Sequence, residues 1–232
     1  MPHRKPEPGF MIIGRKPCLR ISGSGLLNVP HARGDEPKLV PPKAVKVFEK
    51  KGDIYVKFNN GGTKQLTFDG INFDPVLSSS RTKVAFIKKT FGNSCSTGVG
   101  DFEGNELWLI NLGQNKKEKM LIRGKPTNNE DYRTGRVLCA LHSPQFSADE
   151  KKIYFISGAG AVTDAIHQID IDGSNWEHLT GGNSLEVIYD RKSKYYGYLI
   201  INKHKYFPEG GSYDCDWLVS PEGKETKLWS CP

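Results

Sequence analysis

Short hydrophobic runs separated by polar turns follow one another through residues 44–232. The runs are rich in β-branched and aromatic residues, and turn signals such as Asp69-Gly70 and Asp172-Gly173 lie between them. The strands predicted from this pattern are 45–48, 54–58, 65–68, 84–88, 107–112, 119–122, 153–157, 166–171, 177–180, 185–188, 196–202, 216–220 and 226–229. No segment has a convincing helical period. Many short strands at a spacing of about 8–12 residues favour an all-β sandwich, barrel or propeller.

An internal repeat favours the propeller. Residues 74–87 align without a gap with residues 143–156. Each copy has a proline, a serine three residues later, a lysine five residues after that and then an apolar run; these are Pro75, Ser78 and Lys83 in the first copy. Self-similarity at such a period is typical of repeat architectures.

A second motif defines the repeating unit. In four places an aromatic residue or a histidine in a strand is followed, 11–13 residues later, by a leucine. These pairs are Tyr55 and Leu66, Trp108 and Leu121, His167 and Leu179, and Trp217 and Leu228. One unit is therefore four strands, which is the composition of a propeller blade. We expect an all-β propeller of four-stranded blades, with about three full blades and a partial first blade, in a small or incomplete ring.

The repeated Asp/Ser-Pro-x-x-Ser pattern, with its lysine, its strand and a hairpin ending in Leu-Thr, resembles the TolB-type (WD40-like) β-propeller repeat. That repeat also occurs in the propeller domains of some serine peptidases. The family's usual turn, Ser-Pro-Asp-Gly-Lys, corresponds to residues 147–151 and 78–82, and neither copy keeps the glycine. The turn is therefore expected to be built differently or with strain. Residues 141–223 are also similar to uncharacterised bacterial secreted or envelope proteins.

The resemblance raises a question of ring closure, because TolB-type propellers usually close with six blades. Three alternatives remain open. The strand at 45–48 and the tail pair with the last blade, the open sheet edges pair with another chain, or the chain is a truncated product. The second alternative predicts self-association through open sheet edges.

Residues 1–43 differ in composition from the rest of the chain. They hold eight of the 14 prolines and a net charge of +5, which leaves only +2 of the chain's +7 for residues 44–232. We therefore expect a Pro-rich, basic and largely irregular tail at 1–43 and a propeller domain at 44–232. A body near neutrality is a poor match to a phosphate backbone, so we expect no nucleic-acid partner.

The cysteines and the apolar runs of the sequence give information about the cellular compartment of the protein. Five cysteines at wide spacings give no metal-binding pattern and favour buried or incidental thiols, with a Cys95–Cys139 or a Cys215–Cys231 bridge as alternatives. No apolar run approaches the roughly 18–20 residues of a transmembrane helix. No secretion signal is readable, so the chain is cytoplasmic or Met1 is not the native start. The resemblance implies a periplasmic or secreted protein.

The predicted binding site is the loop 204–214, where aromatic rings and a carboxylate follow one another on an exposed connection. The predicted binding residues are His204, Tyr206, Tyr213, Asp214, Asn183 and Glu186. A competing interpretation is an ordinary long hairpin whose aromatic residues cover the edge of the blade.

Four histidines are weak candidates for metal ligands. We expect them on different blades, from which they could converge on a central channel, an arrangement that resembles some propeller sugar lyases. They are His142, His167, His178 and His204. The competing interpretation is that they pack between blades or are hydrated.

The favoured function is a non-catalytic binding or scaffold propeller that holds a protein or peptide in the bacterial envelope. The alternatives are a carbohydrate-active propeller enzyme with a histidine-bound metal, and an accessory propeller of a serine peptidase. Binding is favoured over catalysis, and no catalytic residue and no cofactor is assigned.

Overall fold

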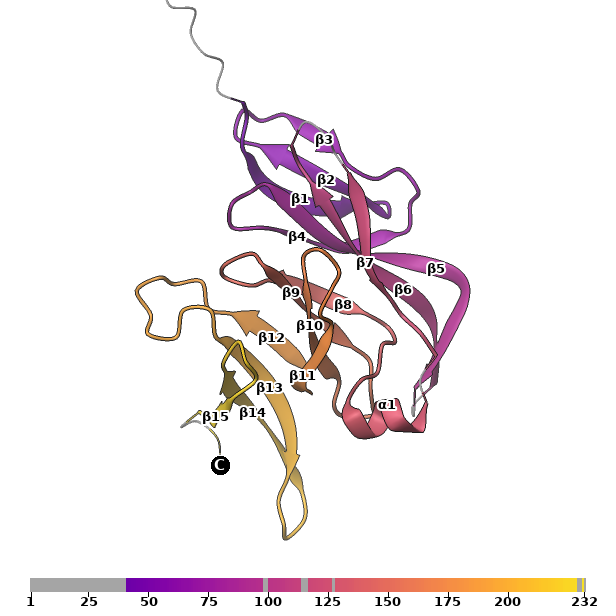
Figure 1. Cartoon of the computed structure of the whole chain (residues 1–232), viewed down its shortest axis with the longest axis vertical. Helices are drawn as coiled ribbons and strands as arrows, with labels where there is room; N and C mark the ends of the chain where they lie inside the picture. Colours follow the sequence, from indigo (N-terminus) through magenta and orange to yellow (C-terminus); the bar gives the residue numbers. More distant parts are fainter. Residues whose placement is uncertain (1–40, 98–99, 114–116, 127, 229–230, 232) are drawn as a thin grey trace, which may run out of the picture. The chain divides into compact units, whose positions relative to one another are not determined.

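The computed structural model describes residues 41–97, 100–113, 117–126, 128–228 and 231. Its strands form four antiparallel sheets, which we call sheet A (β1–β3), sheet B (β4–β7), sheet C (β8–β11) and sheet D (β12–β15) (Figure 1). Their bounds are β1 Ala44–Lys50, β2 Asp53–Phe58, β3 Thr63–Gln65, β4 Asn72–Leu77, β5 Lys83–Thr97, β6 Gly100–Asn111, β7 Glu118–Arg123, β8 His142–Phe146, β9 Lys152–Ser157, β10 Ala165–Asp170, β11 Glu177–Gly181, β12 Ser184–Val187, β13 Leu199–Tyr206, β14 Ser212–Val219 and β15 Glu225–Lys227.

Within each sheet the strands lie side by side in the order in which they follow along the chain. Three four-stranded meanders preceded by a three-stranded one are the arrangement expected of propeller blades. The predicted fold class, with a partial first blade, is confirmed. Among the described residues no strand of sheet A pairs with a strand of sheet D, and β1 pairs with β2. The strand at 45–48 therefore does not close a ring, and the expected tail lies almost wholly outside the described residues.

The four aromatic-to-leucine hairpins have the same register in all four sheets. Each consists of the last two strands of its sheet, and the aromatic residue or histidine pairs with the residue immediately before the leucine. The pairs are Tyr55 with Gln65, Trp108 with Met120, His167 with His178 and Trp217 with Lys227. The sequence motif therefore marks equivalent positions of four blades.

The first strands of sheets B and C were missed in the sequence because each contains a proline. Pro75 lies in β4 and Pro144 in β8, and both strands are at an edge of their sheet. Proline lacks an N–H group and is tolerated in edge strands. Both strands also have a register shift at the same place of the repeat, where Asp74 (φ 48°) and Ser143 (φ 50°) are left-handed.

In both copies of the repeat, the turn that lacks the family's glycine still has a left-handed residue at that position. Arg81 (φ 62°) and Glu150 (φ 57°) occupy the glycine position of the family's turn in the two copies. In both copies the backbone N–H of this residue donates to the serine three residues earlier, Ser78 or Ser147. A non-glycine residue in this conformation carries a cost of about 1–2 kcal/mol. The expectation of a strained turn is therefore confirmed.

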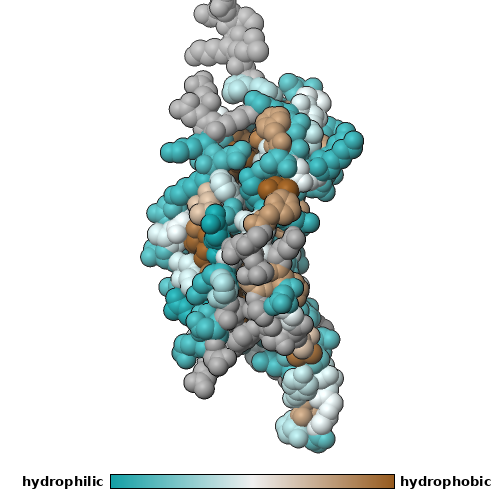
Figure 2. Space-filling model, turned by 90° about the vertical axis from the view of Figure 1, so that its right-hand side faces the viewer, coloured by the Kyte–Doolittle hydropathy of each residue, from teal (hydrophilic) through white to brown (hydrophobic). Residues whose placement is uncertain are grey.

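Among the described residues, the hydrophobic core consists of three clusters between neighbouring sheets and a small fourth cluster around Cys95 and Cys139. The cluster between sheets A and B includes Val56 and Phe86, and the cluster between sheets B and C includes Leu107 and Phe155. The third lies between sheets C and D. On the face seen in Figure 2, hydrophilic side chains predominate. Each sheet thus buries its apolar residues by stacking on the next, as blades do.

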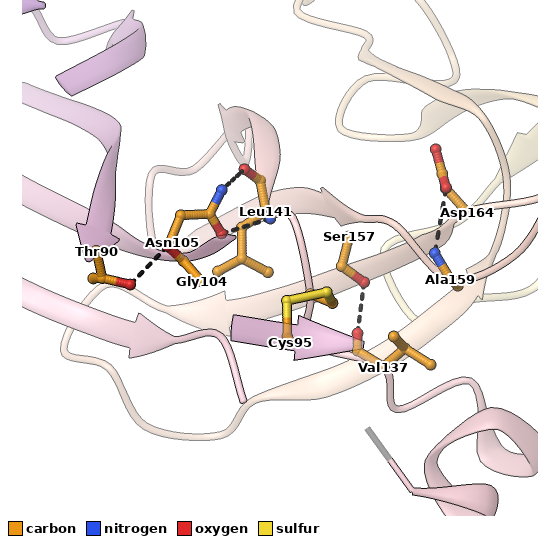
Figure 3. The surroundings of a disulfide bond; sticks show 10 residues. Thr90, Cys95, Gly104, Asn105, Val137, Leu141, Ser157, Ala159 and Asp164 are labelled. Carbon is orange, nitrogen blue, oxygen red and sulfur yellow. Dashed lines mark hydrogen bonds between the residues drawn. A yellow bond between two sulfur atoms is a disulfide. The ribbon is translucent and has the colours of Figure 1, made fainter. Parts of the chain in front are cut away.

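Both disulfide bonds that the sequence left as alternatives are present, so the favoured interpretation of unpaired thiols is wrong for these four cysteines. Cys95 on β5 is bonded to Cys139, which precedes β8, with 5.6 Å between their Cα atoms. Figure 3 shows this bond between the long β5–β6 hairpin and the chain that enters sheet C. Cys215 on β14 is bonded to Cys231. The wide spacing of the cysteines could not favour these pairs, because the Cys95–Cys139 contact depends on how sheets B and C lie together and the Cys215–Cys231 contact on how the chain continues after β15.

The described residues include a single helix, α1 (Asn129–Thr134), which the sequence analysis did not predict. Its six residues are too few to show a hydrophobic period. The Asn128 side chain accepts hydrogen bonds from the N–H groups of Glu130 and Asp131, and Gly135 (φ 68°) ends the helix. Within the described part of the chain, no helix has the length and apolar character needed to cross a membrane.

Candidate functional site

The predicted site lies on a two-stranded ribbon that extends from sheet D. The pairing of β12 with β13 ends at Asn202, and the pairing of β14 with β15 ends at Trp217. Beyond these residues β13 and β14 pair only with each other, up to Tyr206 and Ser212. Figure 1 shows this ribbon projecting past the ends of β12 and β15. We call residues 203–216 the ribbon.

Four of the predicted binding residues lie on the ribbon, three of them on one face. His204 and Asp214 are paired across the two strands, with 2.9 Å between Nδ1 and Oδ1. The ring of Tyr206 lies edge-on to the His204 ring at 5.0 Å, and 66% of Tyr206 is exposed. On the other face of the ribbon, Tyr213 contacts Phe207 with 4.7 Å between ring centroids. The ribbon thus presents an imidazole, a carboxylate and an exposed phenol on one face.

The other two predicted residues, Asn183 and Glu186, have different surroundings. The Asn183 side chain accepts a hydrogen bond from the N–H of Asp164 (3.0 Å) and donates to the carbonyl of Val162 (2.9 Å). Asn183 therefore fixes the loop between β9 and β10 of sheet C. Glu186 is exposed on β12 and pairs with Ile200, four residues before His204.

The face of sheet D that bears the ribbon's polar residues is acidic. Residues directly opposite in neighbouring strands share a face, so Glu186, Asp214 and Asp216 lie on the face opposite to the one packed on sheet C. We call it the outer face of sheet D. Asp216 accepts a hydrogen bond from Asn202 at 3.0 Å. This face therefore favours a partner that carries positive charge or hydrogen-bond donors.

Sequence reasoning missed Asn202 and Asp216 on this face. The signal that could have identified them is the alternation of side chains along a strand. Asn202 precedes His204 by two residues and Asp216 follows Asp214 by two, so each residue shares the face of its predicted neighbour.

The histidines do not occupy different blades. His142, His167 and His178 all belong to sheet C, and only His204 belongs to sheet D. The expectation of one histidine per blade is wrong because the hairpin motif places His167 and His178 opposite each other on neighbouring strands. The described residues contain no group of three or more His, Cys, Asp or Glu that could hold a metal ion.

His167 has the surroundings of a core residue. It is fully buried, and its Nε2 lies 2.9 Å from Oγ of Ser157. Because that hydroxyl donates its own proton to the carbonyl of Val137, the imidazole N–H is the donor to Ser157 (Figure 3 shows the Ser157 bond to Val137). Burial, helped by the nearby His178, lowers the pKa of His167 to about 3. The ring is therefore neutral at physiological pH.

Comparison with known proteins gives no family assignment. No family model matches the chain, and no curated protein matches its sequence. Among solved structures, it is similar to the β-propeller domain of the Trilobed protease from Pyrococcus furiosus, with 12% identity and a TM-score of 0.49 over 81% of this chain. It is also similar to an oligogalacturonate lyase in complex with manganese (12% identity, TM-score 0.46, 75% of this chain) and to a putative TolB from Agrobacterium tumefaciens (15% identity, TM-score 0.34, 81% of this chain).

The chain spans 57% and 41% of the first two of these structures and 79% of the third. The structures that it resembles thus include β-propeller proteins. The fold assignment itself rests on the strand order within the four sheets.

Proposed function

We propose that this protein is a non-catalytic, TolB-like propeller that holds a protein or peptide partner at the ribbon of its last sheet. The observation that carries the proposal is the exposed Tyr206 beside the paired His204 and Asp214. Tyrosine combines a large apolar ring with a hydroxyl and is well suited to contact surfaces. A ribbon of two strands gains little stability by itself in water, so an exposed aromatic ribbon is better explained by a partner than by folding.

The two disulfides support an oxidising compartment, because such bonds are rare in proteins of the cytosol. We place the protein outside the cytoplasm, in the periplasm or secreted, and propose that its partner is another envelope component. The acidic outer face of sheet D favours a partner with a basic contact surface.

The partner can be identified and the site tested in one experiment. A photo-crosslinking amino acid at position 206 should capture the partner in intact envelopes, and the purified pair should then bind in solution. The variant with Tyr206→Ser, Tyr213→Ser and Asp214→Asn should lose this binding by at least tenfold while keeping its unfolding midpoint. A matched control is Phe68→Ser, because Phe68 is also an exposed aromatic residue (79%) but lies between sheets A and B, far in the sequence from the ribbon. Unchanged binding by the triple variant would remove the ribbon as the site.

A second copy of the chain is a different occupant of the same face, favoured by charge. On sheet A, the face turned away from sheet B carries the exposed Lys46 and Lys57 opposite each other, beside the stacked rings of Phe48 and Tyr55. This basic face is complementary to the acidic outer face of sheet D. Sedimentation velocity over a range of salt concentrations tests this association. Dimers that dissociate with salt and in the Lys46→Glu/Lys57→Glu variant support it, and a monomer at all concentrations contradicts it.

A further inference from the structure

A pocket of about 580 Å³ lies between sheets C and D, away from the ribbon. Its lining includes a row of three residues paired across sheet C: Tyr154 on β9, Gln168 on β10 and Glu177 on β11. The rest comes from Lys152 at the start of β9, from the β8–β9 turn, from the segment before β13 and from the β14–β15 turn. The last two lie at the end of sheet D opposite to the ribbon tip. A volume of this size is in the range of pockets that hold small ligands.

The charged groups around the pocket are mainly acidic. Asp149, Glu177 and Glu222 line it together with a single cation, Lys152. Lys152 is already paired with Asp170, at 3.5 Å between Nζ and Oδ1. The pocket therefore offers carboxylate oxygens in excess, which favours a positively charged ligand.

One buried polar group in the lining lacks a partner among the described residues. Gln168 is only 5% exposed, and its Nε2 donates to Glu177 at 2.8 Å, but its Oε1 accepts no hydrogen bond. Tyr154, which pairs with Gln168 across the sheet and lines the same pocket, is only 1% exposed. Burial, together with the charges of Asp149 and Glu222, raises the pKa of Tyr154 to about 12, so the hydroxyl stays protonated. Buried polar groups usually have partners, so Oε1 of Gln168 marks the place of a ligand.

The ring of Tyr196 forms part of the wall. Its hydroxyl donates to the carbonyl of Ala148 at 3.0 Å, which ties sheet D to the turn of sheet C and fixes the ring beside the pocket. An aromatic ring and several acceptors are the surroundings in which a guanidinium group is stabilised, by stacking and by its five N–H donors.

We infer that this pocket binds a guanidinium group, such as the side chain of an arginine. The guanidinium donates to Glu177 and Glu222 and to Oε1 of Gln168, and its plane lies against the Tyr196 ring. This inference goes beyond the proposed function, because the pocket is separate from the ribbon and binds its ligand whether or not the ribbon has a partner.

Isothermal titration calorimetry of the full chain with N-acetyl-arginine methylamide tests the inference. We expect saturable one-to-one binding, and binding at least tenfold weaker for the citrulline analogue, which has nearly the same shape without the charge. The Glu177→Gln/Glu222→Gln variant should bind the arginine probe at least tenfold more weakly. Glu118→Gln is the matched control, since Glu118 is an exposed residue of β7 outside the pocket, and it should bind as the wild type does.

The Gln168→Leu variant separates recognition from folding. Leucine removes the hydrogen bond from Nε2 to the exposed Glu177 but also removes the buried Oε1, which has no partner among the described residues. The two effects oppose each other, so the unfolding midpoint should be nearly retained while the affinity for the arginine probe falls. Three results would each overturn the inference: no measurable binding of the probe, equal binding of the citrulline analogue, or an unchanged affinity in either the double glutamate variant or the Gln168→Leu variant.

Discussion

Replacing Glu150 by glycine would restore the residue that the family's turn normally has, and we expect it to destabilise the protein. Glu150 is left-handed with a φ of 57°, so glycine would relieve strain. Its carboxylate, however, reaches back to the turn of sheet B. It accepts hydrogen bonds from the N–H and the hydroxyl of Ser80 and pairs with Lys83 at 3.1 Å. These contacts join sheets B and C, and glycine would remove all of them.

The two effects differ enough in size to predict the outcome. The relief of strain is about 1 kcal/mol, near the lower end of the cost of a left-handed residue. Hydrogen bonds to charged groups contribute about 1.5–3 kcal/mol each, and two of them at the lower end give about 3 kcal/mol. The Glu150 side chain is 12% exposed, so solvent screens these contacts only in part. We expect a net loss of about 2 kcal/mol in the free energy of unfolding.

Arg81→Gly is the matched control, because Arg81 occupies the same position of the other copy. Its φ is 62°, and among the described residues its guanidinium makes one hydrogen bond, to the carbonyl of Ala44 at 3.1 Å. The loss of one such bond and the relief of strain nearly cancel, so the change should be within about 0.5 kcal/mol of zero. Urea unfolding at pH 7, followed by tryptophan fluorescence and circular dichroism, measures both variants.

The difference should depend on pH. Burial acts to raise the pKa of Glu150, but the hydrogen bonds from Ser80 and the charge of Lys83 outweigh it and hold the pKa below the ordinary value of 4.5. A lowered pKa in the folded state stabilises the protein above the ordinary pKa, and this contribution is lost as the pH falls through the folded value. The wild type should therefore lose its advantage over Glu150→Gly in acid. A glycine variant as stable as the wild type at pH 7 would refute the reasoning.

Two further predictions concern the core. Replacing both Cys95 and Cys139 by alanine should lower the free energy of unfolding by about 4 kcal/mol in the loop-entropy description, and replacing Cys215 and Cys231 should lower it by roughly 3 kcal/mol. The first loss is larger because the first bond spans 44 residues and the second 16. Denaturant unfolding of the two double variants measures both losses, and the reverse order would contradict the prediction. His167 has a lowered folded pKa of about 3, so its neutral form stabilises the protein fully above about pH 6.5 and this contribution is lost as the pH falls from 6.5 toward 3. His167→Phe should make the unfolding free energy less dependent on pH in that range, and an unchanged pH dependence would count against a neutral buried ring.

Much of the fold could be predicted from sequence because the blades repeat. The hairpin motif of the sequence corresponds to one strand register, which pairs Trp108 with Met120 and Trp217 with Lys227. Contacts between blades could not be predicted in this way. The Cys95–Cys139 bond and the bond from Glu150 to Ser80 join residues 44 and 70 positions apart, where no local pattern links the partners.

The candidate site was predictable only in part for the same reason. His204 and Asp214 belong to one hairpin, so their pairing follows from its register. Nothing in the sequence was a reason to treat Asn183 differently from the ribbon residues, but its side-chain amide is already hydrogen-bonded to the backbone of Asp164 and Val162 in sheet C. The pocket lined by Gln168 and Glu222 is formed by two sheets, and no single segment of the sequence contains its pattern.

The side chains of Arg81, Glu150 and Tyr196 each reach back from one sheet to the sheet before it, and to no other. In the part of the chain that the structure describes, these links join each sheet only to its neighbour, as in a linear array of repeats and not a closed ring. When the protein is pulled from its two ends, or only partly denatured, it should come apart one blade at a time. The central pair, covalently tied through Cys95, would be the last to separate.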